Sequence, residues 1–273
     1  MKNILFLILV FLTISCSVKT QQTASLSKDR SAQNIRVMSY NVHHCNPPSK
    51  PGLIDIDAIA TAIKNQNPDL VALQEIDVNT KRSGRYNQAE ELANKLNMKF
   101  FFAKAIDHEG GDYGVAILSK YPLSDSQIYR LPTDAATKGE PRVLATVQVT
   151  LPGGKDIRFG STNFDAQKPS TNRELQIKEI NRIAVNEKLP FIIAGDFNAT
   201  PESSIIRQFD EKFTRTCKSC DPTIPVINPK KTIDFIGFLP ASGFKILSHK
   251  VIPERYASDH LPIIAELQYD LKP

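Results

Sequence analysis

The chain has 273 residues, of which 41% are hydrophobic and 23% are charged. This balance excludes an intrinsically disordered protein, and the chain is long enough to bury one large core. The formal net charge of +5 suits an anionic ligand, although an excess of this size is also typical of ordinary solvated surface.

The first residues have the pattern of an export signal. Lys2 precedes an apolar run at 4–14, and Ser15 and Cys16 follow. A basic start, an apolar run and a small residue before the cleavage point are typical of a signal peptide. The run is shorter than the roughly 20 residues that a membrane-spanning helix needs. Thr13-Ile14-Ser15-Cys16 resembles a bacterial lipobox, which implies lipid attachment at Cys16; a plain secretory signal with an incidental cysteine is the alternative.

Residues 17–34 are rich in Ser, Thr, Lys and Gln and contain few large apolar residues, which predicts a flexible tether. No second change of composition follows. We therefore divide the chain into a signal peptide at 1–15, a lipidated tether at 16–34 and one domain at 35–273, expected to be monomeric. This organisation predicts an exported lipoprotein, anchored to a membrane and facing the periplasm or the cell exterior.

Strands alternate with helices in the predicted domain. Period-2 alternation predicts a strand at 35–41, and Leu53, Ile56, Ile59 and Ile63 have the spacing of a helix that ends near residue 67. Further strands are predicted at 70–73, 115–118, 143–149, 157–159, 191–194, 233–239, 244–247 and 263–267, with helices around 89–96 and 175–184. Tight turns such as 151–155 require antiparallel neighbours, so we expect mixed sheets that pack together with helices outside.

Polar residues recur at the ends of these predicted strands, where a rigid scaffold commonly presents a site. They lie in the segments Tyr40-Asn41, Gln74-Glu75, Thr162-Asn163, Gly195-Asp196-Phe197-Asn198 and Ser258-Asp259-His260. Asp234 lies inside an apolar strand, where an ionised carboxylate needs a partner. Hard oxygen ligands of this kind suit Mg²⁺ or Mn²⁺, and a histidine beside a carboxylate suits proton transfer near neutral pH. Each segment alone is equally typical of a turn or a solvated strand end.

The order of the segments resembles the endonuclease/exonuclease/phosphatase family, which includes DNase I and exonuclease III. The matching segments span most of 35–268 and are Ser39-Tyr40-Asn41, Leu73-Gln74-Glu75, Ala116-Ile117-Leu118-Ser119, Gly195-Asp196-Phe197-Asn198, Ile233-Asp234-Phe235 and Ser258-Asp259-His260. The resemblance implies a four-layer α/β sandwich and a divalent-metal-dependent hydrolase of phosphate esters. It also implies that Glu75 and Asn41 hold the metal, Mg²⁺ or Mn²⁺, and that Asp259 completes the metal or water network.

The resemblance implies catalytic roles as well. Asp196 would orient or deprotonate the attacking water, and Asn198 would donate a hydrogen bond to the phosphoryl oxygens. His260 would be the acid/base or phosphate-stabilising group, with Asp234 fixing its tautomer. The chain departs from the family at Asn163, where many members have a histidine, because an amide can donate a hydrogen bond but cannot supply a proton.

Four further residues are candidates for contacting the substrate phosphate. Arg142 and Arg82 carry guanidinium groups, whose planar fork suits phosphate geometry. His43 lies two residues after Asn41, and Tyr113 precedes a strand that lines the site in the family. A structural or solvated role is the alternative for each.

The substrate is predicted less directly. Lys and Arg are scattered along the chain and there is no Trp, whereas a nuclease ordinarily shows basic residues along the nucleic-acid backbone and aromatic residues for stacking. The sequence therefore favours a phosphodiesterase acting on a small or lipid-linked phosphodiester. A nuclease acting on DNA or RNA is the first alternative, and a binding lipoprotein that kept the fold but lost turnover is the second.

Cys217 and Cys220 have C-x-x-C spacing, and Cys45 stands alone. A zinc site would need two more ligands at suitable spacing, and none stands nearby. In an oxidising compartment the spacing favours a local disulfide, with free thiols and a metal site as the alternatives.

Overall fold

The computed structural model of the protein describes residues 32–270. The predictions that concern the signal peptide, the lipidation of Cys16 and the tether up to residue 31 lie outside the described residues. The first strand, β1, begins at Ala32 rather than at residue 35, because its first residues pair with the last strand of the fold. No helix between residues 32 and 270 is long and apolar enough to cross a membrane.

Two six-stranded mixed sheets form the centre of the fold. The first sheet contains, in spatial order, β11 (Lys245–Val251), β12 (Ile263–Asp270), β1 (Ala32–Asn41), β2 (Leu70–Val78), β4 (Gly111–Ser119) and β3 (Lys99–His108). The second contains β5 (Leu123–Arg130), β6 (Val143–Thr150), β7 (Asp156–Asn163), β8 (Phe191–Asp196), β10 (Asp234–Leu239) and β9 (Thr214–Arg215).

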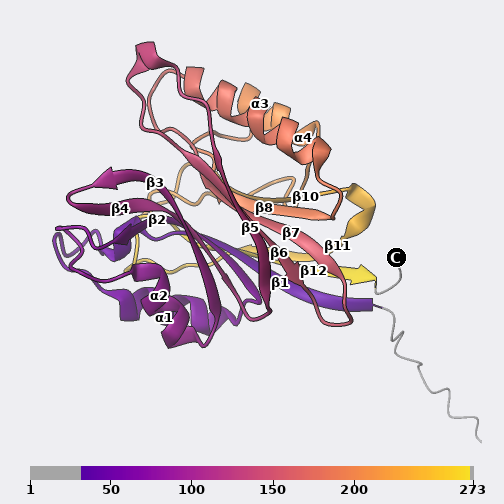
Figure 1. Cartoon of the computed structure of the whole chain (residues 1–273), viewed down its shortest axis with the longest axis horizontal. Coiled ribbons are helices and arrows are strands. Elements are labelled where there is room, and N and C mark those ends of the chain that lie inside the picture. The colour runs from indigo at the N-terminus through magenta and orange to yellow at the C-terminus, as the bar shows by residue number, and fades with distance from the viewer. Residues whose placement is uncertain (1–31, 271–273) are drawn as a thin grey trace, which may run out of the picture. The chain divides into compact units, whose positions relative to one another are not determined.

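Helices cover the outer face of each sheet (Figure 1). The helices are α1 (Ile56–Gln66) and α2 (Gln88–Leu96) on the first sheet, and α3 (Thr171–Asn186) and α4 (Ser204–Asp210) on the second, with short 3₁₀ turns at His43–Cys45, Ala135–Thr137 and Ala241–Gly243. Side chains alternate along each strand between the two faces. Val37 of β1 therefore packs between the sheets, whereas Met38 packs under the helices, and Ile192 and Ile193 of β8 divide in the same way. The predicted four-layer sandwich is confirmed.

Each sheet has one parallel pair, β1 with β2 and β7 with β8, and antiparallel neighbours elsewhere. A parallel pair needs a long crossover, which α1 provides in the first sheet and α3 in the second. Asn41, Asn163 and Asp196 lie at the carboxyl ends of β1, β7 and β8, whereas Gln74 and Glu75, predicted to end a strand, lie in the middle of β2 because the strand continues past a bulge to Val78. Ligands of open α/β sheets bind at such ends, so the topology already indicates where the site lies.

The sequence missed three edge strands and one helix and misplaced a helix start. One of these strands, β9, has only two residues, too few to show a pattern. β5 is almost wholly exposed and β3 is exposed at its beginning, so neither shows the alternation of a half-buried strand. α4 has only seven residues. α1 begins at Ile56, after Asp55, which accepts a hydrogen bond from the Ala58 amide as the N-cap. Leu53, predicted to belong to this helix, precedes it and is exposed.

Candidate active site

Three neighbouring strands place Asn163, Asp196 and Asp234 side by side. Asn163 at the end of β7 is opposite Asp196 at the end of β8, and Asp196 is opposite Asp234 at the start of β10. All three side chains are at least 97% buried. Two carboxylates on adjacent strands in direct register repel each other, and neither can be solvated well. Burial and the charge of Asp234 accordingly raise the pKa of Asp196 to about 7, although hydrogen bonds and His260 oppose the rise.

His260 lies between the two carboxylates. Its Nδ1 is 3.0 Å from Oδ2 of Asp234, and its Nε2 is 3.8 Å from Oδ2 of Asp196. Burial alone lowers the pKa of His260, but the charge and hydrogen bond of Asp234 and the charge of Asp196 outweigh it and raise that pKa to about 10. His260 is therefore an imidazolium at neutral pH, and Asp234 orients its Nδ1–H. The pairing predicted from the lone carboxylate in an apolar strand is present.

The other sheet contributes Asn41 and Glu75. The Asn41 amide nitrogen lies 3.1 Å from Oε1 of Glu75 and 3.1 Å from Oδ2 of Asp196, so this side chain connects the two sheets. Glu75 has a left-handed backbone conformation, with φ +60°, inside an irregularity of the β2–β4 pairing. Bulges near sites turn a side chain away from the regular alternation, and the strain of a left-handed glutamate persists only where the surroundings hold it. The bulge turns the Glu75 carboxylate toward Asn41.

The last site segment is tied to the end of β1. The hydroxyl of Ser258 donates to the Asn41 carbonyl at 2.7 Å, and the His260 amide donates to that hydroxyl at 3.3 Å. Asp259, between them, is half-buried. The segment thus places His260 beside Asp196 and Asp234, with Asp259 next to it, and a metal contact by Asp259 stays a prediction.

Asn198 and Asn163 meet beside Asp196. The Asn198 backbone amide donates to Oδ1 of Asp196 at 2.8 Å, and its side-chain amide donates to the Phe164 carbonyl at 2.9 Å and approaches Oδ1 of Asn163 at 3.4 Å. Asn198 adopts a left-handed conformation, with φ +46°, which asparagine tolerates better than most residues. The structure therefore brings all eight predicted catalytic and metal residues together. Their individual roles stay predictions.

Arg142 and Tyr113 form a wall of the same site. Both are 8% exposed, and together with Asn163 they line a small crevice. Arg142 pairs with Glu140 at 3.2 Å, but its buried Nε has no hydrogen-bond partner among the described residues. Burial lowers the pKa of Arg142, yet the nearby Tyr113, Glu140 and Glu75 raise it overall, so the guanidinium keeps its charge. The Nε of Arg142 is thus an unsatisfied buried donor, and a direct phosphate contact by Arg142 stays a prediction.

The other two phosphate candidates have protein partners. Arg82 donates to both carboxylate oxygens of Asp77, at 2.7 and 2.8 Å, and its guanidinium lies 5.4 Å from the centre of the Tyr113 ring. The ring nitrogen Nδ1 of His43 lies 3.0 Å from the Asn46 carbonyl oxygen, and the His43 amide donates to the Asn41 side chain. Arg82 thus contacts Tyr113, and His43 contacts Asn41. A direct phosphate contact by Arg82 or His43 stays a prediction.

Sequence reasoning missed Thr223. Its hydroxyl donates to Oδ2 of Asp234 at 2.5 Å, and the residue is fully buried. Thr223 lies in an irregular segment between Pro222 and Pro225, far from any predicted strand, so neither periodicity nor a motif indicated it.

The donor set fits a divalent metal. Among the described residues, Asp196, Asp234 and His260 have ligand atoms within 4.8 Å of one another. Asp234 already accepts from Thr223 and pairs with His260, whereas Glu75 accepts one hydrogen bond, from Asn41, within residues 32–270. The set holds four carboxyl groups, more than the charges of His260 and Arg142 can offset, so a phosphate substrate would meet a negative site. A bound divalent cation would offset that repulsion, and hard oxygen donors of this kind suit Mg²⁺ or Mn²⁺.

The chain belongs to the Endonuclease/Exonuclease/phosphatase family, whose model matches residues 38–260. It is therefore a phosphoester hydrolase, in a family that generally uses divalent metal ions. This confirms the family, the fold and the enzyme class that the ordered segments predicted.

Individual relatives show how far the similarity extends. The uncharacterized protein YbhP of Escherichia coli strain K12 is 24% identical over 249 residues, which cover 86% of this chain and 96% of YbhP. An endonuclease/exonuclease/phosphatase from Beutenbergia cavernae DSM 12333 is 22% identical with a TM-score of 0.74, over 87% of this chain and 72% of that one. A mannosyl-6-phosphatase from Bacteroides thetaiotaomicron VPI-5482 is 16% identical with a TM-score of 0.69, over 85% and 99%. Identity at this level shows a shared fold and does not select a substrate.

The Asp234–His260 pair generates a test by double substitution. We expect His260→Ala to lower turnover by about 10²–10⁴-fold, because loss of an acid/base group typically costs that much. Asp234→Asn should cause a loss of the same kind, and the double variant should be little worse than the worse single one, since residues that act as a unit are not additive. Steady-state kinetics with a circular-dichroism check of folding measure this. Losses that multiply would show that the two residues act separately.

Proposed function

We propose that the protein is a Mg²⁺- or Mn²⁺-dependent phosphodiesterase that acts on a small or lipid-linked phosphodiester. The observation that carries the proposal is the buried set of Asp196, Asp234 and His260, in which one carboxyl has a pKa near neutrality and the imidazole is held as a cation. Such a pair offers a proton acceptor and a positive charge side by side, which is what attack by water on a phosphate ester requires.

Each residue of the site has its own role in the proposed hydrolysis. Asp196 would accept the proton of the attacking water, and its pKa of about 7 suits that task. His260 would face the phosphoryl oxygens with its Nε2–H, while Asp234 holds its Nδ1–H. Asn198 and Arg142 would add hydrogen bonds to the phosphate. Glu75 and Asn41, with Asp259, would hold the metal, which when bound polarises the phosphoryl group and offsets charge that builds up in the transition state.

A small or lipid-linked substrate is supported by composition and by the site wall. The chain lacks Trp, the residue best suited to stacking on bases, and its cations are scattered. Arg142, a cation in the site wall, lines a small crevice with Tyr113 and Asn163. A hydrolysis screen of residues 32–273 with Mg²⁺ or Mn²⁺ tests the substrate class, using bis-p-nitrophenyl phosphate, phospholipids, sugar phosphates and plasmid DNA. Preference for plasmid DNA would favour the nuclease alternative, and no turnover of any substrate would favour the binding-lipoprotein alternative.

Metal dependence is the second property to test. Excess EDTA should abolish turnover, and added Mg²⁺ or Mn²⁺ should restore it. Glu75→Gln should weaken Mn²⁺ binding, measured by calorimetry or by electron paramagnetic resonance, because it removes the charged donor that the β2 bulge turns into the site. Glu90→Gln, an exposed glutamate of α2, is the matched control and should bind Mn²⁺ as the natural chain does. Full turnover in excess EDTA would rule out the metal mechanism.

The proposed location rests on the N-terminal sequence. We propose that Cys16 carries a lipid anchor, on the strength of the apolar run and the segment Thr13-Ile14-Ser15-Cys16. Cys16→Ala should release the protein from the membrane fraction, as judged by fractionation and immunoblotting of whole cells. A variant that still sediments with membranes would argue against lipidation.

A further inference from the structure

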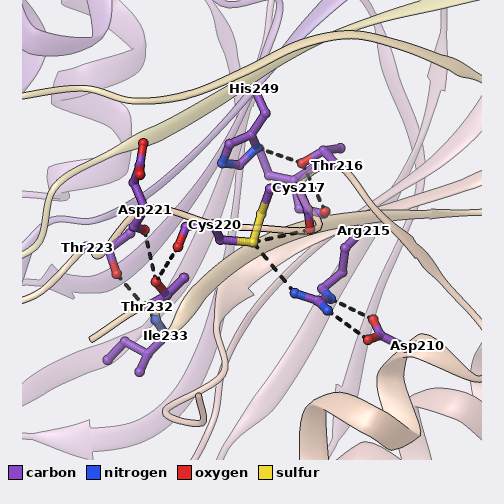
Figure 2. The surroundings of a disulfide bond; sticks show 11 residues. Asp210, Arg215, Thr216, Cys217, Cys220, Asp221, Thr223, Thr232, Ile233 and His249 are labelled. Carbon is purple, nitrogen blue, oxygen red and sulfur yellow. Dashed lines mark hydrogen bonds and ion pairs between the residues drawn. A yellow bond between two sulfur atoms is a disulfide. The ribbon is translucent and has the colours of Figure 1, made fainter. Parts of the chain in front are cut away.

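The segment between β9 and β10, residues 216–233, contains a disulfide between Cys217 and Cys220 and is called the disulfide loop below (Figure 2). This confirms the disulfide predicted from the C-x-x-C spacing. The site as proposed so far makes no use of it. The loop nevertheless leads directly into Asp234, and its contacts reach the site.

The loop is held to the middle of β10 and to β11 on one side of the disulfide, and to its own returning arm on the other side. Before the disulfide, the Thr216 amide donates to the Ile236 carbonyl at 2.9 Å, and the Thr216 hydroxyl lies 2.8 Å from Nδ1 of His249. After the disulfide, the Thr232 hydroxyl donates to the carbonyls of Cys220 and Asp221, both at 3.0 Å. The disulfide lies between these two attachments, as Figure 2 shows, and so fixes the path of the chain from one to the other.

Thr223 connects this loop to the Asp234–His260 pair. Its hydroxyl donates to Oδ2 of Asp234, the same oxygen that lies 3.0 Å from Nδ1 of His260. Its carbonyl accepts the amide of Leu261 at 2.8 Å, and Leu261 directly follows His260. Its own amide donates to the Lys231 carbonyl at 2.8 Å. One buried residue of the loop therefore holds the carboxylate of the pair by its side chain and the histidine segment by its backbone.

We propose that Thr223 is a positioning residue for the Asp234–His260 pair, and that the Cys217–Cys220 disulfide holds the loop that carries Thr223 in place. Turnover then depends on whether the disulfide is intact. The inference rests on the hydrolase function proposed above. A carboxylate held by a single partner can rotate about its side-chain bonds, whereas Thr223 and His260 together fix Asp234. Misplacement of a catalytic group by about 1 Å can cost on the order of 10²-fold in rate, so a small shift of the loop would lower turnover.

The disulfide is placed where a reductant can reach it. Cys217 is buried but Cys220 is half-buried, and Nη1 of Arg215 lies 3.6 Å from its sulfur. Two other guanidinium nitrogens of Arg215 are held by Asp210 at 2.6 and 2.9 Å, which keeps the cation beside the sulfur. A neighbouring cation favours the thiolate form of a cysteine and so favours its release as a leaving group.

A dithiol reduces the disulfide in two exchange steps. One thiolate of the dithiol attacks a disulfide sulfur, the Cys217–Cys220 bond breaks and a mixed disulfide forms. The second thiol of the reductant then attacks the mixed disulfide and displaces the protein sulfur from it, and the reductant leaves as a cyclic disulfide. The dithiol loses two electrons and two protons, and the protein gains two thiols. Reformation of the bond by an oxidised thiol reverses the change.

The test compares oxidised and dithiothreitol-reduced protein, with thiol titration confirming two new thiols, and bis-p-nitrophenyl phosphate as the probe. Reduction should lower kcat on the order of 10-fold with KM changed less than about 2-fold, since the pair and not substrate binding is disturbed. Cys217→Ser combined with Cys220→Ser should show the same low kcat and no response to dithiothreitol. This variant also controls for binding of the reagent to metal.

Substitutions of Thr223 separate positioning from packing. Thr223→Val should lower kcat by about 10–100-fold, because supporting hydrogen bonds of a site typically have effects of that size, and Thr223→Ser should restore most of it. Thr146→Val is the control, since Thr146 is buried in β6 and its hydroxyl has no partner within residues 32–270. Unchanged kcat in fully reduced protein, or a Thr223→Ser variant as slow as Thr223→Val, would overturn the inference.

The inference can also be tested if the oxidised protein hydrolyses nothing, an outcome that would count against the proposed function instead. Hydrogen exchange at the Leu261 amide then reports on the loop, because that amide donates to the Thr223 carbonyl. Faster exchange of Leu261 after reduction would support coupling of the disulfide to the pair. Unchanged exchange would overturn it.

Discussion

Two carboxylates that face each other in a buried antiparallel pairing are the constraint on which the site depends. The β8–β10 register places Asp196 directly opposite Asp234, and both side chains are 2% exposed. Two adjacent charges cannot both be buried without compensation. His260 supplies one positive charge between them. The burial and repulsion that it does not offset raise the pKa of Asp196. The chemistry proposed for the protein follows from that imbalance, because one carboxyl near neutrality can exchange a proton while the imidazole stays charged.

The rest of the fold holds Asp196 and Asp234 of the second sheet close to Asn41 and Glu75 of the first sheet. Each sheet contributes a parallel pair of strands, and Asn41 links the two by bridging Glu75 of the first sheet and Asp196 of the second. The core between the sheets fixes the separation of these strand ends, since it is built from tightly packed apolar side chains on both inner faces. The separation of the two groups of residues therefore depends on the packing of the whole sandwich.

The sequence predicted much of this because the physical signals were local. Asp234 is a charge inside an apolar strand, which indicated that it had a buried partner, and the ordered strand-end segments indicated which residues would meet. β3 and β5 were missed because they lie at sheet edges, where exposed side chains need not alternate. Thr223 was missed because its contact with Asp234 depends on the path of an irregular loop, for which no periodicity exists. Arg142 was predicted as a phosphate ligand from its residue type, but its burial and its unpartnered Nε depend on the tertiary structure.

Titration of the His260 imidazole in the metal-free protein, followed by NMR of its ring carbon and nitrogen signals, tests the central claim most directly. The charge and hydrogen bond of Asp234 raise the pKa of His260 well above the ordinary 6.5, to about 10, so the imidazolium should persist through neutral pH and be lost only as the pH rises toward that value. Asp234→Asn should lower this pKa, because it removes the charge and replaces the hydrogen-bond acceptor of the Nδ1–H. A His260 that titrates at or below 6.5, or that is indifferent to Asp234→Asn, would contradict the account.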